Sequence, residues 1–129
     1  MVDREKLEQM HASGFNCAQC VASYFAETIG LDERTALAAT GGFGGGFRSG
    51  DICGAASAAA MVLGLKYPYY DNKNDWAKAE ILLKTREFNK RFIERYGNLD
   101  CRDLKGKGRV SCDELICGAA EIVDEIISK

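Results

Sequence analysis

Six cysteines in a chain of 129 residues are the feature of this sequence that could do chemistry. Four of them follow an Asn, Asp or Ser by one or two positions: Cys17, Cys53, Cys101 and Cys112. Because these residue types favour the N-cap, each of the four cysteines is expected in the first turn of a helix. The unpaired N–H groups and the positive dipole end there stabilise a thiolate. The spacing therefore predicts thiolate chemistry at four helix N-termini.

Gathered in one pocket, four thiolates could hold an iron–sulfur cluster, which we favour, or a closed tetrahedral zinc site. Such a centre would serve electron transfer or redox sensing. The first alternative is a metal-free dithiol/disulfide protein. In it, Cys17 and either Cys53 or Cys101 form the exchanging pair. The second is a helical interaction module in which the cysteines only pack as small hydrophobic residues. The pattern is compatible with an oxidoreductase and with an electron carrier, and it does not identify the redox partner.

Three neighbouring features add to this set. Cys17 and Cys20 form a C-x-x-C motif at a predicted helix start, an arrangement of dithiol oxidoreductases and of metal chelates, so Cys20 could add a ligand. Gly54 beside Cys53 leaves room for a cofactor to approach that sulfur. On a helical wheel Cys117 falls away from the apolar stripe of the last helix, so we expect it to be peripheral or at a subunit contact.

Composition narrows the class of protein. The length suits a single domain over residues 1–129, and a net charge of −2 gives no reason to expect nucleic acid. No apolar run reaches the length of a membrane span, and the N-terminus lacks a signal peptide, so a cytoplasmic protein is predicted. In a reducing cytosol, clustered cysteines indicate metal binding or redox chemistry rather than disulfides. Helices rich in Ala and Gly would allow the close contact of a homodimer.

The elements that must position these cysteines are all helices. Apolar residues recur every three or four positions, and no segment alternates with period two. Helices are expected over residues 3–12, 16–29, 32–40, 51–66, 75–96 and 111–127, with a connector over 98–109. Six glycines between positions 41 and 50 predict an irregular loop before the Cys53 helix. The predicted fold is all-α, a compact bundle of about five or six helices.

With these residues in view, the chain resembles the C_GCAxxG_C_C family, which is named for its cysteine pattern. The matching segments include F-N-C-A-Q at 15–19, the glycine run at 41–46, I-C-G-A-A-S-A at 52–58 and N-L-D-C-R-D-L at 98–104. The resemblance places the four signature cysteines at Cys17, Cys53, Cys101 and Cys112, and one motif glycine is replaced by Ala58. It implies redox activity or metal binding through the cysteines, with iron–sulfur ligation as a candidate. The resemblance does not indicate a substrate.

Overall fold

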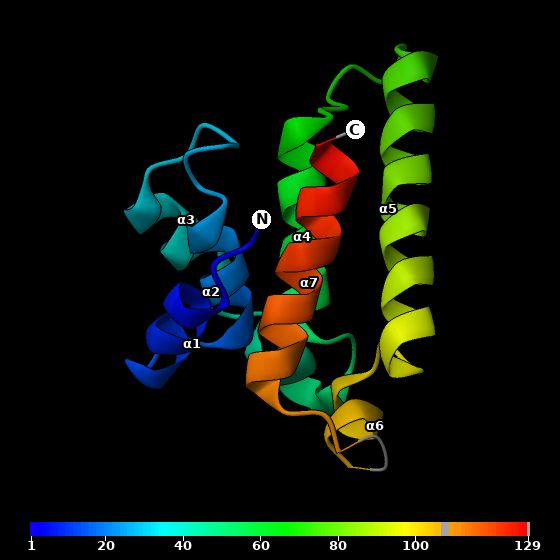
Figure 1. Cartoon of the computed structure of the whole chain (residues 1–129). Helices are drawn as coiled ribbons and strands as arrows, with labels where there is room; N and C mark the ends of the chain where they lie inside the picture. The colour runs from blue at the N-terminus through cyan, green and yellow to red at the C-terminus, as the bar shows by residue number, and fades with distance from the viewer. Residues whose placement is uncertain (107–108, 129) are drawn as a thin grey trace.

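The computed structural model describes residues 1–106 and 109–128, and within these ranges the regular elements are helices, without a strand. The all-α prediction is confirmed. Seven α-helices and one short π-helical turn make up this part of the chain (Figure 1): α1 (Arg4–Ala12), α2 (Cys17–Tyr24), α3 (Glu33–Thr40), η1 (Gly46–Gly50), α4 (Gly54–Lys66), α5 (Asp75–Tyr96), α6 (Cys101–Lys105) and α7 (Cys112–Ile127).

Two helices, α4 and α7, run side by side through the middle of the bundle, with α5 on one flank and α1 to α3 on the other (Figure 1). Helix α4 contacts α2, α5 and α7. It can do so because Ala55, Ala58 and Ala59 are fully buried, and methyl side chains let neighbouring helices approach closely. The alanine-rich sequence therefore determines which helix lies at the centre.

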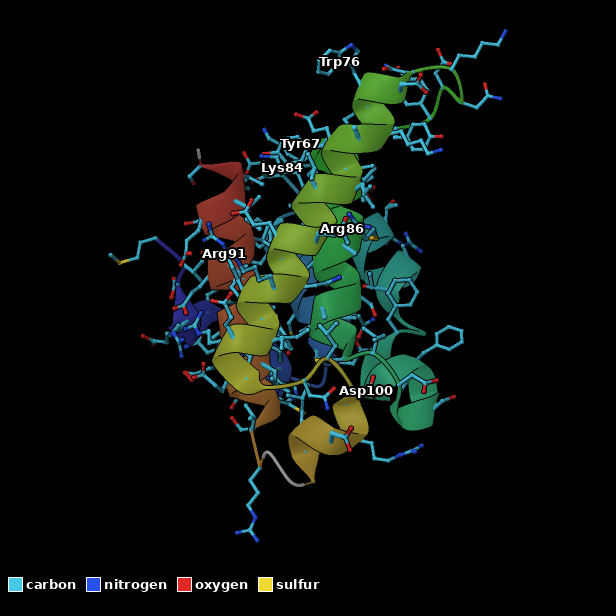
Figure 2. All side chains as sticks on the ribbon, turned by 90° about the vertical axis from the view of Figure 1, so that its right-hand side faces the viewer. Tyr67, Trp76, Lys84, Arg86, Arg91 and Asp100 are labelled. Atoms are coloured by element: carbon cyan, nitrogen blue, oxygen red, sulfur yellow. The ribbon has the colours of Figure 1, made fainter. Side chains whose placement is uncertain are left out.

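The long helix α5 contributes larger apolar side chains to the core. Phe88 and Phe92 of α5 are buried, with ring centroids 5.6 Å apart, and each contributes about 2 kcal/mol through its buried area. Lys84 lies over the Tyr67 ring and links α5 to the end of α4, whereas Trp76 at the start of α5 projects into solvent (Figure 2). Across the described residues, no helix has both the length and the apolar character to cross a membrane.

Helix starts follow the predicted caps in most cases. Asn16 and Gln19 form a complete capping box at α2. At α7, Ser111 accepts the Glu114 N–H, while the Glu114 carboxylate binds Arg4 and Tyr96. Helix α2 ends at Tyr24, several residues before the predicted stop, and turns carry the chain to α3.

Two segments predicted to be irregular contain short helices, which is why the bundle exceeds the expected number. The glycine-rich loop forms η1, where left-handed backbone extends from Gly45 and Gly46 into Phe47 and Arg48. The connector over 98–109 contains α6, and its positions 107 and 108 lie outside the described residues. The two short elements contact each other, and Arg102 of α6 donates to the Ser49 carbonyl (3.1 Å).

Candidate redox site

An isolated antiparallel bridge between Ile52 and Asp100 joins two segments that are distant in sequence. The Cys53 N–H donates to the Leu99 carbonyl (2.7 Å), and the Cys101 N–H donates to the Asp51 carbonyl (2.6 Å). Two signature cysteines therefore flank one bridge. Figure 2 shows Asp100 at the end of the molecule opposite Trp76, where Figure 1 shows α6 and the start of α7.

The predicted cap of the Cys53 helix is wrong. Helix α4 begins at Gly54, so Cys53 itself is the N-cap residue, and it makes no side-chain capping bond. Asp51 is not the cap because its backbone is used in the bridge. The prediction is confirmed for Cys17, Cys101 and Cys112, which are the first residues of α2, α6 and α7.

Cys17 and Cys53 are neighbours in the structure, because the Cys17 Sγ packs against Gly54, the residue after Cys53, and each thiol shifts the pKa of the other. The Cys53 side chain lowers the pKa of Cys17, and the backbone N–H groups of Gly45, Ala18 and Ala55 act in the same direction. The pKa of Cys53 is raised, first by its bond to Cys17 and then by burial. The two shifts have opposite directions, so Cys17 loses its proton more readily than Cys53.

Glycines allow the loop to close over this pair. A Cβ at Gly54 would lie 2.6 Å from the Cys17 Sγ and 2.8 Å from the Phe43 carbonyl oxygen. The room expected beside Gly54 is thus filled by Cys17 itself. Gly46, at φ +63°, passes so close to Cys101 that a Cβ there would lie 2.7 Å from the Cys101 Cβ. The glycine run packs its backbone directly against the cysteines.

Cys101 is held near the pair by the bridge, and Cys112 begins α7. Burial raises the pKa of Cys101, and the charges of Cys17 and Cys112 act in the same direction. Cys112 is half-buried. The pKa of Lys105 is raised, first by Cys112 and also by the charge of Cys101.

Lys105 is the residue that sequence reasoning missed. It follows Cys101 by four positions, and residues with this spacing lie on the same face of a helix. The spacing could have indicated it, had the connector been recognised as helical. The arginine of the glycine-rich loop, Arg48, donates to the Gly41 carbonyl.

The arrangement shows a pair of thiols more clearly than a set of metal ligands. Across residues 1–106 and 109–128, no group of three or more His, Cys, Asp or Glu side chains is placed to hold a metal ion. Thiols are the donors that iron–sulfur clusters and zinc prefer, so the donor type fits, while the present spacing does not. The predicted metal centre stays a prediction.

The remaining two cysteines are buried in the core. Cys20 is completely buried and donates to the Phe15 carbonyl (3.9 Å), and burial raises its pKa to about 12. The expectation that Cys117 is peripheral is wrong, because it is 1% exposed and donates to the Arg4 carbonyl (3.9 Å). Helix α1 covers this face of α7, which a helical wheel of α7 alone cannot show.

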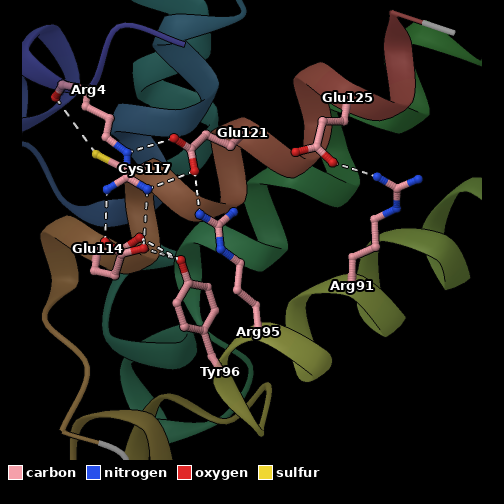
Figure 3. A network of polar contacts seen from close by, with 8 residues as sticks. All are labelled: Arg4, Arg91, Arg95, Tyr96, Glu114, Cys117, Glu121 and Glu125. Atoms are coloured by element: carbon pink, nitrogen blue, oxygen red, sulfur yellow. Dashed lines mark hydrogen bonds and ion pairs between the residues drawn. The ribbon is translucent and has the colours of Figure 1, made fainter. Parts of the chain in front are cut away.

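An ion network holds the start of α7, and with it Cys112, against α1 and α5 (Figure 3). Arg4 donates to both carboxylate oxygens of Glu121 (2.7 and 2.8 Å) and to Glu114 (2.9 Å). Arg95 adds a bond to Glu121, and the Tyr96 hydroxyl donates to Glu114 (2.6 Å). The guanidinium of Arg4, followed by that of Arg95, lowers the pKa of Glu121 to about 2.

A hollow of about 640 Å³ lies between α4, α5 and the glycine-rich loop. Its wall is mainly apolar and includes Phe47, Ile52 and Leu99. No cysteine is among its lining residues. The hollow therefore adjoins the bridge without opening onto the thiols.

The comparisons agree with the cysteine geometry. Residues 15–126 match the model of the family described as "Putative redox-active protein (C_GCAxxG_C_C)". Neither the curated proteins nor the solved structures include a match to this chain. The matched range contains all six cysteines and both segments joined by the bridge. The chain therefore belongs to the C_GCAxxG_C_C family.

Proposed function

We propose that this protein is a dithiol–disulfide redox protein in which Cys17 and Cys53 are the exchanging pair. The observation that carries the proposal is the close packing of the Cys17 Sγ against Gly54, the residue that directly follows Cys53. Helices α2 and α4 pack against each other, and the two cysteines lie at the starts of these helices, as the residues of an exchanging pair must. The lowered pKa of Cys17 supports the same role, because the thiolate is the nucleophile in exchange.

The reaction needs a disulfide as the oxidising partner. The Cys17 thiolate attacks one sulfur of that disulfide, and the other sulfur leaves as a thiolate. Cys53 then gives up its proton and attacks the Cys17 Sγ, so that the second partner sulfur leaves and takes the proton. One disulfide forms in the protein and one breaks in the partner, with two electrons passing to the partner. Run in reverse, the same steps reduce the protein.

A second candidate function is the metal centre, with Cys17, Cys53, Cys101 and Cys112 as ligands of an iron–sulfur cluster or zinc. Its support is the placement of four thiols of one family pattern at the same end of the bundle. Binding would require the sulfurs of Cys101 and Cys112 to move toward the pair. When bound, such a centre would supply one-electron transfer or structural cross-linking.

One preparation tests both candidates. The protein is purified without oxygen, its iron and zinc are measured, and it is equilibrated in dithiothreitol buffers of graded potential before alkylation and peptide mapping. We expect a reversible two-electron transition that joins Cys17 to Cys53, absent from Cys17→Ser and Cys53→Ser and unchanged in the control Cys20→Ser. A protein with one equivalent of metal and no such disulfide would replace the first candidate with the second.

The proposal extends to the location, the partner and the oligomeric state of the protein. A cytoplasmic location would keep the resting pair reduced, because that compartment maintains thiols. The partner would be a protein or small molecule that carries a disulfide, and the activity that of an oxidoreductase or electron carrier. A homodimer is also proposed, and light scattering of the reduced protein would test it.

A further inference from the structure

The hollow between α4, α5 and the glycine-rich loop has the size of a small-molecule site. Its volume of about 640 Å³ lies within the range of roughly 300–1,000 Å³ that such sites occupy. Helix α4 contributes Ala56 and Ala60 to its wall, and α5 contributes Thr85 and Asn89. Each pair is four positions apart, so each lies along one face of its helix. The hollow exists because the methyl side chains of α4 leave open the space between the two rows.

Two aromatic rings of the glycine-rich loop, Phe43 and Phe47, also line the hollow. Phe47 is 66% exposed, so its ring lies at the mouth and is not part of the core. Its backbone is left-handed, at φ 60° and ψ 36°, a conformation that is unfavourable for a bulky side chain. Strain of this kind persists mainly at functional sites, where it positions a side chain for a ligand. The loop therefore offers a flat apolar surface to a bound molecule.

Three polar side chains of the wall are available to a ligand. Ser57, Thr85 and Asn89 are half-buried, and their side chains form no hydrogen bond within residues 1–106 and 109–128. Hydroxyl and amide oxygens accept hydrogen bonds, so each of the three can receive an N–H group of a bound molecule. A few polar groups in a mainly apolar wall are typical of a site that orients a small ligand.

The charge of the hollow is negative. Among the described residues that line it, Asp51 alone is ionisable, and its carboxylate has no ion pair or hydrogen bond to another described residue. The bridge fixes the position of Asp51, because its carbonyl accepts the Cys101 N–H (2.6 Å). Arg48 and Arg102 each donate to a backbone carbonyl within residues 41–50 and form no ion pair with this carboxylate. A cationic ligand would complement the hollow.

We propose that this hollow binds a small aromatic cation, of the class of aromatic amines and amidines. The flat apolar body of the ligand packs against Phe43 and Phe47, and its charged N–H groups pair with Asp51 and with the Asn89 carbonyl oxygen. The positive charge can also lie over the face of an aromatic ring. The site is independent of the chemistry of the cysteines, because no cysteine lines the hollow.

The test titrates the full chain, labelled for NMR, with naphthamidine, naphthamide and naphthoate. These probes share one shape and are positive, neutral and negative. We expect the amidine to bind about fivefold more tightly than the amide, and the naphthoate to bind most weakly, because a partly exposed ion pair contributes up to about 1 kcal/mol. Asp51→Asn should bring the affinity for the amidine down to that for the amide. Equal affinities for the amidine and the naphthoate, or no saturable shift of the lining residues, would overturn the proposal.

A second variant separates binding from folding. Phe47→Gly removes the ring at the mouth and relieves the left-handed backbone, since glycine adopts positive φ without strain. We expect it to weaken the binding of naphthamidine about tenfold without lowering the unfolding temperature. Arg48→Gly is the matched control, because it relieves the same conformation (φ 58°) at a residue that does not line the hollow. It should bind naphthamidine like the unchanged protein, and an equal loss of affinity in both variants would overturn the proposal.

Discussion

The sulfur of Cys17 occupies the space where a side chain at Gly54 would begin. A Cβ built at Gly54 would lie 2.6 Å from that sulfur, closer than such atoms pack in proteins. The first turn of α4 can reach the exchanging pair only because it begins with glycine. The family pattern of Cys followed by Gly thus has a packing reason in this chain.

Gly54→Ala is expected to separate the pair. The added methyl must displace the Cys17 sulfur or the Phe43 carbonyl, at a cost of about 1–3 kcal/mol in the free energy of unfolding. Urea unfolding and the yield of the Cys17–Cys53 disulfide would measure the two effects. The control is Gly64→Ala in the same helix, where no atom lies within 4 Å and alanine should stabilise by about 0.5–1 kcal/mol. Equal behaviour of the two variants would contradict the packing described.

Cys53→Ala is expected to raise the pKa of Cys17. The Cys53 side chain is the largest cause of the lowered value, so its loss should move the titration of Cys17 upward toward the ordinary 9.0. The pH dependence of iodoacetamide alkylation, followed on the Cys17 peptide, measures this. Cys20 is the internal control, because its thiolate should appear only near pH 12. An unchanged midpoint for Cys17 would show that the thiols do not interact.

The Arg4–Glu121 pair is expected to make the free energy of unfolding decrease as the pH falls into the acid range. The pKa of Glu121 falls from 4.5 to about 2 on folding, so its contribution is complete above pH 4.5 and is lost as the pH falls toward 2. Glu121→Gln should therefore cost about 2 kcal/mol at pH 7 and much less near pH 2. Urea unfolding at both values measures the difference.

The control for this prediction is on the same helix. Glu125 pairs with Arg91 but is 56% exposed, and an exposed pair contributes less than about 1 kcal/mol. Glu125→Gln should lower the free energy of unfolding by about 0.5 kcal/mol or less. The dependence of that free energy on acid pH should change little. A loss as large as that of Glu121→Gln would mean that the Arg4–Glu121 pair contributes no more than the exposed Arg91–Glu125 pair, which Figure 3 shows beside it.

Tyr96→Phe is expected to loosen α5 from the start of α7. The hydroxyl donates to the Glu114 carboxylate (2.6 Å), and a bond to a charged acceptor contributes about 1.5–3 kcal/mol. The ring should stay in place, because Gly118 leaves it room on α7. Thermal unfolding measures the loss, and Tyr70→Phe, at a side chain 92% exposed, should have no effect.

The helices and most of their starts could be predicted from sequence because their signals are local. The capping box at Asn16 and the apolar stripe with Phe88 and Phe92 lie within single helices, and each is present in the structure. The four signature cysteines could be selected in the same way, since three of them begin helices as their caps indicate.

The rest depended on contacts between distant segments. The pairing of Ile52 with Asp100 joins two loops without any periodic pattern, and it takes Asp51 away from the expected cap position. The burial of Cys117 requires α1 to lie across α7. The role of Lys105 depends on a five-residue helix in a segment that looked irregular. In each case the determining interaction crosses from one element to another.

The bridge between Ile52 and Asp100 has a consequence for motion. The amide protons of Cys53 and Cys101 are both held by this one ladder, and no adjoining strand reinforces it within the described residues. The two amides should therefore exchange with deuterium together, in a local opening that leaves the central helices protected. Such an opening would expose the thiols to solvent while the helical bundle stays folded.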